Sequence, residues 1–198
     1  STNMLKTLSG RNASQNEFEL RSFIKFLKDK EVKSYLEIGA RHGDTFHEIM
    51  INLPKGSRGV AVDLPGGLWG RETSKISLKA AASDLRQRGY DIEIILGDST
   101  EESIIEKVYA NGLFDAMLID GNHLYEGVLK DFENYAPLAP LIAFHDIVGT
   151  DQIEKVYKNK VEVPNLWQEI KDAEIYEIVE FIDKNSRMGI GIACTSPF

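Results

Sequence analysis

Several features that would place the chain outside the cytoplasm are missing from its sequence. It has one cysteine, Cys194, so no disulfide can form within the chain. Its apolar runs are far shorter than the roughly 20 residues that a membrane-spanning helix needs. The opening stretch STNMLKTLSGRNASQ lacks the charged-then-apolar layout of a signal peptide. These absences predict a cytoplasmic protein with no membrane partner.

Positive charge is also scarce. The 23 Lys and Arg residues are outnumbered by 31 Asp and Glu residues, which leaves a net charge of -8. Proteins that follow a phosphate backbone need a basic face, because their affinity comes largely from the release of counterions. We therefore expect no nucleic-acid partner.

Length and patterning predict a single domain over residues 1–198. A chain of this length with 42% hydrophobic residues can bury roughly 70% of the surface that it exposes when unfolded. Ser14 and Glu17 have the spacing of a capping box, and the apolar stripe after them predicts a helix over about residues 15–29. Residues 1–14 are expected to form a mobile arm, which could pack across a homodimer.

Short β-rich runs alternate with helical stretches from residue 34 onwards. Such alternation is typical of βαβ units, in which a parallel sheet is covered by helices on both faces. The last two runs, IYEIVEFI and MGIGIACT, are separated only by DKNSR, which suits an antiparallel hairpin. We expect a Rossmann-like α/β fold with a seven-stranded, mostly parallel sheet that ends in an antiparallel hairpin. The five parallel strands are predicted in SYLEIG, RGVAVDL, DIEIILGD, FDAMLIDG and LIAFHDI.

A glycine loop follows the first of these strands, in YLEIGARHGDTF. Glycines at this position let a ligand approach the backbone, and the helix after them offers amide donors. The pattern, Gly39 and Gly43 with three residues between them, departs from the dinucleotide fingerprint, because Arg41 stands where the middle glycine would be. It therefore predicts a ligand site without a pyrophosphate cradle.

Acidic residues end the next two strands. Asp63 lies about 20 positions after Gly43, where a carboxylate can accept hydrogen bonds from ribose hydroxyls, and Asp98 ends the third strand. Open α/β sheets bind ligands at this edge. The alternative is that the glycines only make a tight turn and the aspartates cap helices.

Asp120 ends the fourth strand, and the pair His145-Asp146 ends the fifth. Neighbouring parallel strands end at one edge, so these side chains are candidate ligands of a divalent cation. Carboxylates suit Mg²⁺, Mn²⁺ or Ca²⁺, and imidazole shifts the preference towards transition metals. His123, three residues after Asp120, could face the same pocket as a base. Each residue alone could instead be a turn, cap or hydrogen-bonded structural residue.

The motifs in this order resemble those of the class I S-adenosylmethionine-dependent methyltransferases, over roughly residues 32–195. EIGARHG is similar to their first motif, Asp63 to the acidic residue on the ribose, and the segment at Asp98 to the one beside the adenine. The terminal hairpin fits their sheet, whose last strand is antiparallel. The donor-binding residues that this implies are Glu37, Gly39, Ala40, Gly43, Asp63, Asp98, Ser99 and Asp120.

The segment from Asp120 to Asp146 resembles metal-dependent O-methyltransferases of the catechol type and, more closely, those acting on macrolide sugars. It also looks like proteins labelled cephalosporin hydroxylases. The resemblance implies Asp120 and His123 as catalytic residues and a cation, Mg²⁺ by preference, held by Asp120, His145 and Asp146. His145 stands where the family has a carboxylate. The implied acceptor is a small-molecule hydroxyl, first a sugar or polyhydroxy compound and second a phenol.

Other functions fit parts of the pattern. His123, His145 and one aspartate would make the metal set of a non-haem iron oxygenase. An NAD-dependent dehydrogenase is disfavoured by Arg41, and a non-catalytic nucleotide-binding module would leave the aspartates and histidines idle. The acceptor is expected to contact residues 1–14, 65–75 and 147–165.

A few polar or aromatic residues are expected to be structural. His47 is predicted to line a helix surface, and Asp131 to lie on a solvated helix face. Trp69 is expected to pack within its loop in preference to contacting the substrate.

Overall fold

The computed structural model describes residues 4–6, 12–66, 74–149 and 161–195. The predictions for Trp69, and for most of the loops expected around the acceptor, concern residues outside these ranges. None of the helices in the described ranges is long and apolar enough to cross a membrane.

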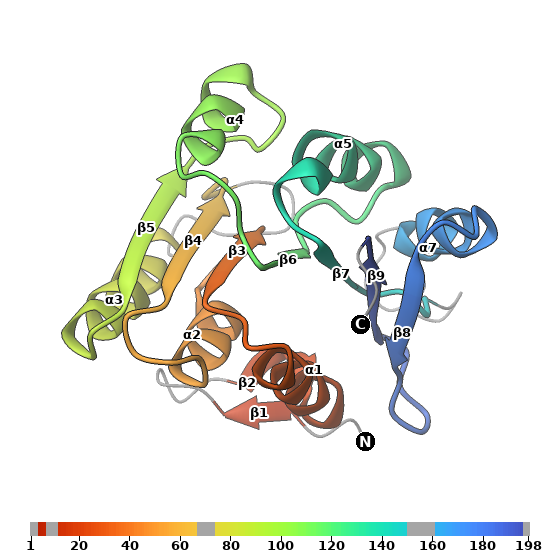
Figure 1. The fold of residues 1–198 in the computed structure, drawn as a ribbon, viewed down its shortest axis with the longest axis horizontal. Helices are drawn as coiled ribbons and strands as arrows, with labels where there is room; N and C mark the ends of the chain where they lie inside the picture. Colours follow the sequence, from red (N-terminus) through yellow and green to blue (C-terminus); the bar gives the residue numbers. More distant parts are fainter. Residues whose placement is uncertain (1–3, 7–11, 67–73, 150–160, 196–198) are drawn as a thin grey trace.

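A seven-stranded sheet forms the centre of the molecule, and its strand order is β5-β4-β3-β6-β7-β9-β8. Within this sheet, strands β3 to β7 pair in parallel. Strand β9 lies between β7 and β8 and is antiparallel to both (Figure 1). The predicted Rossmann-like fold with its C-terminal antiparallel hairpin is confirmed. The strands are β3 (Ser34–Ile38), β4 (Arg58–Asp63), β5 (Asp91–Leu96), β6 (Ala116–Ile119), β7 (Leu141–His145), β8 (Glu177–Phe181) and β9 (Ile190–Cys194).

Helices cover both faces of this sheet. On one face lie α1 (Glu17–Asp29), α2 (Asp44–Ile51) and α3 (Ser74–Gln87). On the other lie α4 (Glu102–Tyr109), α5 (Tyr125–Tyr135) with a 3-10 turn at Ala136–Leu138, and α7 (Val163–Asp172).

Alternation along the strands divides the core into two layers. In β3, Tyr35 faces α2, where its ring stacks on Phe46 at 6.0 Å, while Leu36 and Ile38 join the opposite layer. Because β6 and β7 are buried on both faces, their sequences are apolar almost throughout. The polar residues that the site needs are thereby confined to the strand ends.

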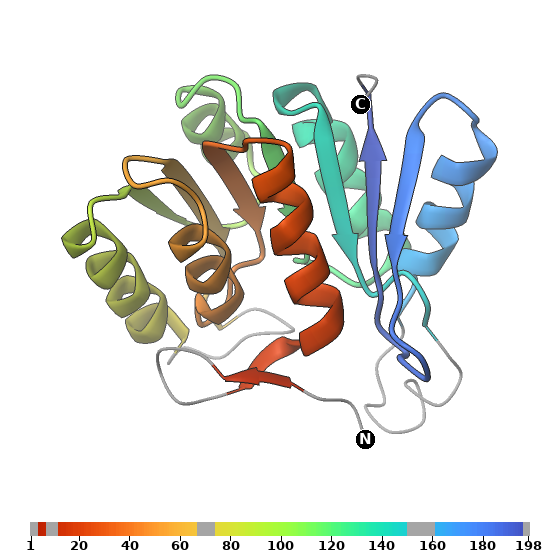
Figure 2. The ribbon, with the colours of Figure 1, turned by 60° about the horizontal axis from the view of Figure 1, so that its bottom comes forward.

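The N-terminal segment differs in detail from the sequence prediction. Strands β1 (Met4–Lys6) and β2 (Asn12–Asn16) form a small antiparallel sheet, so part of the expected arm is extended structure. Figure 2 shows this sheet below the carboxyl ends of the parallel strands. The Ser14–Glu17 capping box is wrong, because residue 14 is still in β2. The N-cap is Asn16, whose side chain accepts a hydrogen bond from the Glu19 amide at 3.0 Å.

Candidate active site

The loop after β3 brings backbone segments into unusually close approach. Gly39 has φ +87°, and a Cβ there would lie 2.4 Å from the Cα of Gly121, which follows β6. Glycine is therefore required where the two loops meet. Gly43 has φ +81°, but a Cβ at Gly43 would contact Leu78 of α3, so this glycine serves helix packing.

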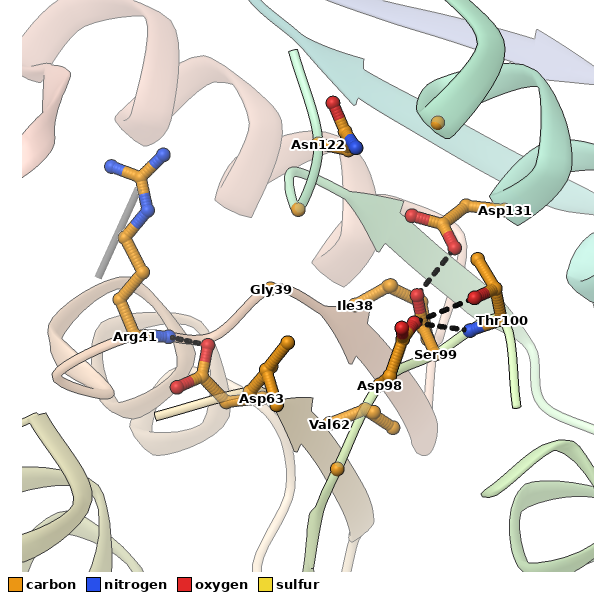
Figure 3. A pocket seen from close by; sticks show the side chains of 14 residues that line it. Ile38, Gly39, Arg41, Val62, Asp63, Asp98, Ser99, Thr100, Asn122 and Asp131 are labelled. Carbon is orange, nitrogen blue, oxygen red and sulfur yellow. Dashed lines mark hydrogen bonds between the residues drawn. The ribbon is translucent and has the colours of Figure 1, made fainter. Parts of the chain in front are cut away.

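A cavity of about 210 Å³ opens at this edge of the sheet (Figure 3). Four of the predicted donor-binding residues line it: Gly39, Asp63, Asp98 and Ser99. The other four, Glu37, Ala40, Gly43 and Asp120, are not part of its lining. The remaining lining residues are Ile38, Arg41, Val62, Leu64, Gly97, Thr100, Gly121, Asn122, Gly127 and Asp131.

Asp63 presents an unused carboxylate oxygen at this cavity. Its Oδ1 accepts a hydrogen bond from the Arg41 amide at 3.0 Å, while its buried Oδ2 has no partner among the described residues. Burial raises the pKa of Asp63 above its ordinary value. The next helix, α3, begins only at Ser74, so Asp63 is not its cap. A buried acceptor without a partner is costly, and ligand hydroxyls could satisfy it.

Asp98 and Ser99 make local contacts at the far side of the cavity. Asp98 Oδ1 accepts hydrogen bonds from the Thr100 amide at 2.8 Å and from the Thr100 hydroxyl at 2.7 Å. Ser99 Oγ donates to Asp131 Oδ1 at 2.6 Å. The two residues thus shape the wall and connect β5 to α5.

Asp131 was expected on a solvated helix face, and this is wrong. It is 1% exposed and lines the cavity, and burial raises its pKa to about 6. The buried residues of α5 are Val128, Asp131 and Tyr135, at the 3–4 spacing of one helical face. That spacing is visible in the sequence and could have identified Asp131 as buried.

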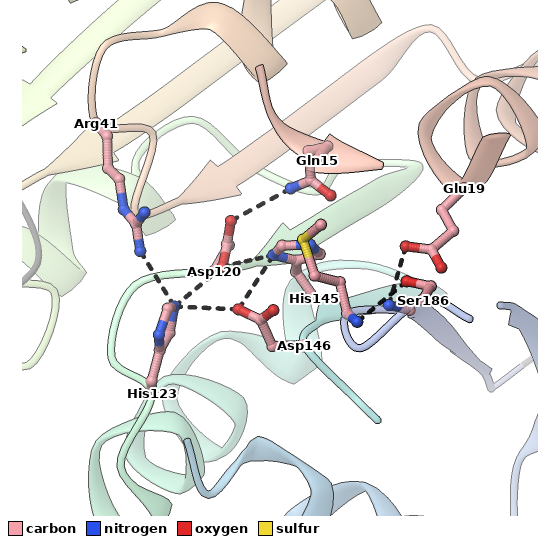
Figure 4. Close-up of polar contacts among 10 residues, drawn as sticks. Gln15, Glu19, Arg41, Asp120, His123, His145, Asp146 and Ser186 are labelled. Atoms are coloured by element: carbon pink, nitrogen blue, oxygen red, sulfur yellow. Dashed lines mark hydrogen bonds and ion pairs between the residues drawn. The ribbon is translucent and has the colours of Figure 1, made fainter. Parts of the chain in front are cut away.

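The four side chains predicted at the ends of β6 and β7 do come together (Figure 4). The Nδ1 atom of His145 lies 3.3 Å from both Asp120 Oδ1 and Asp146 Oδ2. The Nε2 atom of His123 lies 3.4 Å and 3.5 Å from the same two oxygens. Asp146 has φ +67°, a left-handed conformation that is uncommon for non-glycine residues, although aspartate adopts it more readily than most.

Arg41 determines which role the His123 ring has in their hydrogen bond. Its Nη2 atom lies 3.1 Å from His123 Nε2, and a guanidinium can only donate hydrogen bonds. His123 Nε2 is therefore the acceptor in this contact, and the same atom lies beside the two carboxylates. Arg41 also has a left-handed backbone, with φ +50°.

Charges within the cluster favour ionised aspartates. Burial alone would raise the pKa of Asp120, but the charge of His145 and the hydrogen bond from its ring outweigh it and lower that pKa. The pKa of Asp146 is lowered by His145 in the same way, against the effect of burial. Burial would lower the pKa of His145, but the two aspartates raise it well above its usual value.

The donor set fits a divalent cation. Within the described ranges, one group of ligand atoms lies within 4.8 Å of one another: those of Asp120, His123 and Asp146. A cation bound by these atoms would offset the repulsion between the two ionised carboxylates. Two carboxylates and one imidazole suit Mg²⁺, Mn²⁺ or a transition metal.

His145 has a different place from the one expected. It contacts both aspartates through Nδ1 but is not part of this converging group, and its buried Nε2 has no partner among the described residues. The group contains one histidine, whereas the iron-oxygenase hypothesis needs two.

The prediction that His47 lines a helix surface is wrong. His47 is 2% exposed, and its Nε2 lies 2.6 Å from Asp84 Oδ2 of α3. This contact lowers the pKa of Asp84. It joins α2 to α3, and neither residue lines the cavity.

No protein-family model matches the chain, and a search of curated proteins found no match. Solved structures do match. An O-methyltransferase from Bacillus cereus in complex with S-adenosylhomocysteine is 14% identical, with a TM-score of 0.68 over 91% of this chain and 82% of that one. The O-methyltransferase of Streptomyces achromogenes involved in tomaymycin synthesis, in complex with S-adenosylmethionine, is 13% identical, with a TM-score of 0.69 over 93% and 82%.

The methyltransferase domain of bacterial CtHen1-CN also matches, at 15% identity and a TM-score of 0.61 over 90% of this chain and 98% of that one. At such identities the likeness shows that the chain has the methyltransferase fold.

Proposed function

We propose that this protein is an S-adenosylmethionine-dependent O-methyltransferase that acts on a hydroxyl group of a small molecule. The observation that carries the proposal is the Oδ2 atom of Asp63, which has no partner among the described residues and lies in a cavity formed by a glycine loop at the carboxyl edge of a methyltransferase-like sheet. Support also comes from the two O-methyltransferases of the same fold that were solved with the adenosyl donor or its product.

The donor would lie in the 210 Å³ cavity. Asp63 would accept the hydrogen bonds of the ribose hydroxyls, and Gly39 would let the donor approach the backbone. The wall near Ser99 and Asp131 would contact the adenine. Each role uses a group that already points into the cavity or borders it.

The acceptor would lie beside the group of Asp120, His123 and Asp146. We propose that Asp120 and Asp146 hold a divalent cation there, Mg²⁺ by preference, with the imidazole of His123 or His145 completing the set. When bound, the cation would act as a Lewis acid that makes an acceptor hydroxyl more acidic. A sugar or other polyhydroxy compound is the proposed acceptor, on the strength of the sequence resemblance.

In the transfer, the hydroxyl oxygen bonds to the methyl carbon, the carbon–sulfur bond breaks, and the sulfonium becomes a neutral thioether. The hydroxyl proton must leave the oxygen. We propose that His123 takes it through Nε2, once Arg41 has released its hydrogen bond to that atom. The protein otherwise aligns oxygen, carbon and sulfur.

Calorimetric titration with S-adenosylmethionine, S-adenosylhomocysteine and NAD, each with and without Mg²⁺, tests the proposal. We expect micromolar binding of the two adenosyl compounds and none of NAD. Sugars and phenols would then be screened as acceptors. Absence of adenosyl binding under both conditions would refute the methyltransferase function, and donor binding without methylation of any acceptor would favour a non-catalytic module.

His123→Ala tests the base. General-base catalysis contributes about 10² to 10⁴-fold, so kcat should fall by that factor while the affinity for S-adenosylhomocysteine stays within twofold. His47→Gln is the control, because it changes a buried histidine that does not line the cavity and should leave kcat per folded molecule unchanged. A Mn²⁺ titration of both variants separates the roles: a tenfold loss of Mn²⁺ affinity in His123→Ala would identify His123 as a ligand.

A further inference from the structure

The start of α1 reaches the candidate cation site from outside the parallel sheet. Gln15, at the end of β2, and Glu19, in the first turn of α1, are both 0% exposed. Figure 4 shows them approaching the site from the side opposite His123. Two buried polar residues so close in sequence suggest a common task.

Gln15 acts on Asp120. Its Nε2 donates a long hydrogen bond to Asp120 Oδ2, at 3.4 Å, while Asp120 Oδ1 faces the two histidines. The amide orientation follows from chemistry, because an ionised carboxylate only accepts hydrogen bonds. Gln15 Oε1 has no partner among the described residues, which an apolar side chain of the same size would avoid. The contact with Asp120 is therefore what distinguishes glutamine here from leucine or methionine.

Glu19 is connected to Asp146 through one residue, Gly189. Its two carboxylate oxygens accept hydrogen bonds from the amides of Gly189, at 3.0 Å, and Asp183, at 2.9 Å. These residues lie in the turn between β8 and β9. The carbonyl of Gly189 in turn accepts a hydrogen bond from the Asp146 amide at 3.1 Å. Two successive hydrogen bonds thus connect Glu19 to Asp146, whose backbone is left-handed.

The two contacts act on different strands of the sheet. Asp120 follows β6 and Asp146 follows β7, so their oxygens are brought together from separate elements. Asn16, between Gln15 and Glu19, adds a hydrogen bond from its Nδ2 to Asp183 Oδ2 at 3.1 Å. The start of α1 is thereby tied both to the end of β6 and to the hairpin that supports Asp146.

We propose that Gln15 and Glu19 are positioning residues that hold the carboxylates of Asp120 and Asp146 at the spacing a divalent cation requires. This inference rests on the proposed function, in which those two carboxylates bind the cation. It assigns the N-terminal segment a task in the site that differs from the acceptor contact expected for residues 1–14. Neither residue touches the donor cavity.

The test compares Gln15→Leu and Glu19→Gln with the wild-type protein. Glutamine at position 19 offers one acceptor oxygen and one NH₂ group to two backbone amides, so one hydrogen bond must be lost. Glu17→Gln is the matched control, because it makes the same change in the same turn at a partly exposed residue paired with Arg21. Mn²⁺ affinity is measured by electron paramagnetic resonance, S-adenosylhomocysteine affinity by calorimetry, and unfolding by circular dichroism.

Loss of a residue that orients metal ligands typically lowers metal affinity 10–100-fold. We expect such a loss of Mn²⁺ affinity, by at least about tenfold, in Gln15→Leu and Glu19→Gln and none in Glu17→Gln. Affinity for S-adenosylhomocysteine should stay within twofold in all three. If Glu19→Gln does not fold, Gln15→Leu decides the question.

Unchanged Mn²⁺ affinity in the folded variants would overturn the inference and leave the proposed function intact. Equal losses of Mn²⁺ and S-adenosylhomocysteine affinity would also overturn it, since they would indicate a general loss of structure. A wild-type protein that binds S-adenosylhomocysteine but no Mn²⁺ would refute the cation site itself, and this inference with it.

Discussion

At the scale of single residues, the site is marked by polar atoms whose partners are missing. Asp63 Oδ2, Gln15 Oε1 and His145 Nε2 are buried without a partner among the described residues. Each belongs to a side chain whose other polar atom is used, so the side chain is held in place while one atom stays available. Such half-satisfied groups are expected where a ligand completes the hydrogen bonding.

Asp63→Asn should weaken donor binding while preserving the fold. Asparagine can still accept from the Arg41 amide, but it replaces one carboxylate oxygen with an NH₂ group and removes the charge. Hydrogen bonds to a charged group contribute about 1.5–3 kcal/mol, so the affinity for S-adenosylhomocysteine should fall by about 10–100-fold in calorimetry. Asp91→Asn, at an exposed strand end, is the control. Equal affinity of the two variants would show that Asp63 does not bind the ribose.

At the scale of elements, the site depends on how closely β3 and β6 approach after their last residues. Ile38 of β3 pairs with Ile119 of β6, and the loops that follow the two strands leave the sheet at the same edge. A Cβ at Gly39 would collide with the backbone of Gly121, as well as with the Asp120 carbonyl at 2.5 Å. Backbone cannot move aside as a side chain can, so the loop has a steric reason for glycine besides its φ.

Alanine substitutions at two glycines, Gly56 and Gly39, distinguish the cost of a positive φ from the cost of the steric clash. Gly56 has φ +88°, close to the +87° of Gly39, but nothing lies within 4 Å of the Cβ it would carry. Gly56→Ala should cost about 1–2 kcal/mol, the conformational penalty alone. Gly39→Ala should cost about 2 kcal/mol more, since the new methyl overpacks the loop, and should abolish donor binding. Urea unfolding and calorimetry measure both effects, and equal stability of the two variants would contradict the steric argument.

At the scale of the whole molecule, a cluster of acidic groups at one end of the sheet makes stability depend on pH. Glu37 is 2% exposed, and its Oε1 accepts a hydrogen bond from Tyr35 Oη at 2.6 Å. Burial raises its pKa from 4.5 to about 8; Asp120 and Asp63 add to the rise, and Tyr35 and Arg41 reduce it. Glu37 is thus protonated at neutral pH in the folded protein.

The sign of the effect follows from proton binding. Between pH 4.5 and about 8 the folded state keeps the Glu37 proton that the unfolded state has released, so stability falls as pH rises. Glu37→Gln has no such proton, and its stability should gain on the wild type by up to about 1.4 kcal/mol per pH unit across this window. Urea unfolding at several pH values between 5 and 8 measures the difference. A constant difference would mean that Glu37 is ionised in the folded protein.

Much of this arrangement was predictable from sequence, because it depends on local patterns. Alternation of apolar runs with helical stripes predicted all seven strands of the main sheet and the antiparallel hairpin. Parallel strands end at a common edge, so the terminal residues Asp63, Asp120, His145 and Asp146 could be grouped without coordinates.

Tertiary structure alone decided the rest, since it depends on contacts between residues far apart in the chain. His47 looked like a surface residue, and only its contact with Asp84 of α3 shows that it is buried. Three contacts in the site join segments that are 82 to 170 positions apart in the sequence. They are those of Arg41 with His123, Gln15 with Asp120, and Glu19 with Gly189. Sequence periodicity reports which face of an element is buried, but not which partner meets it there.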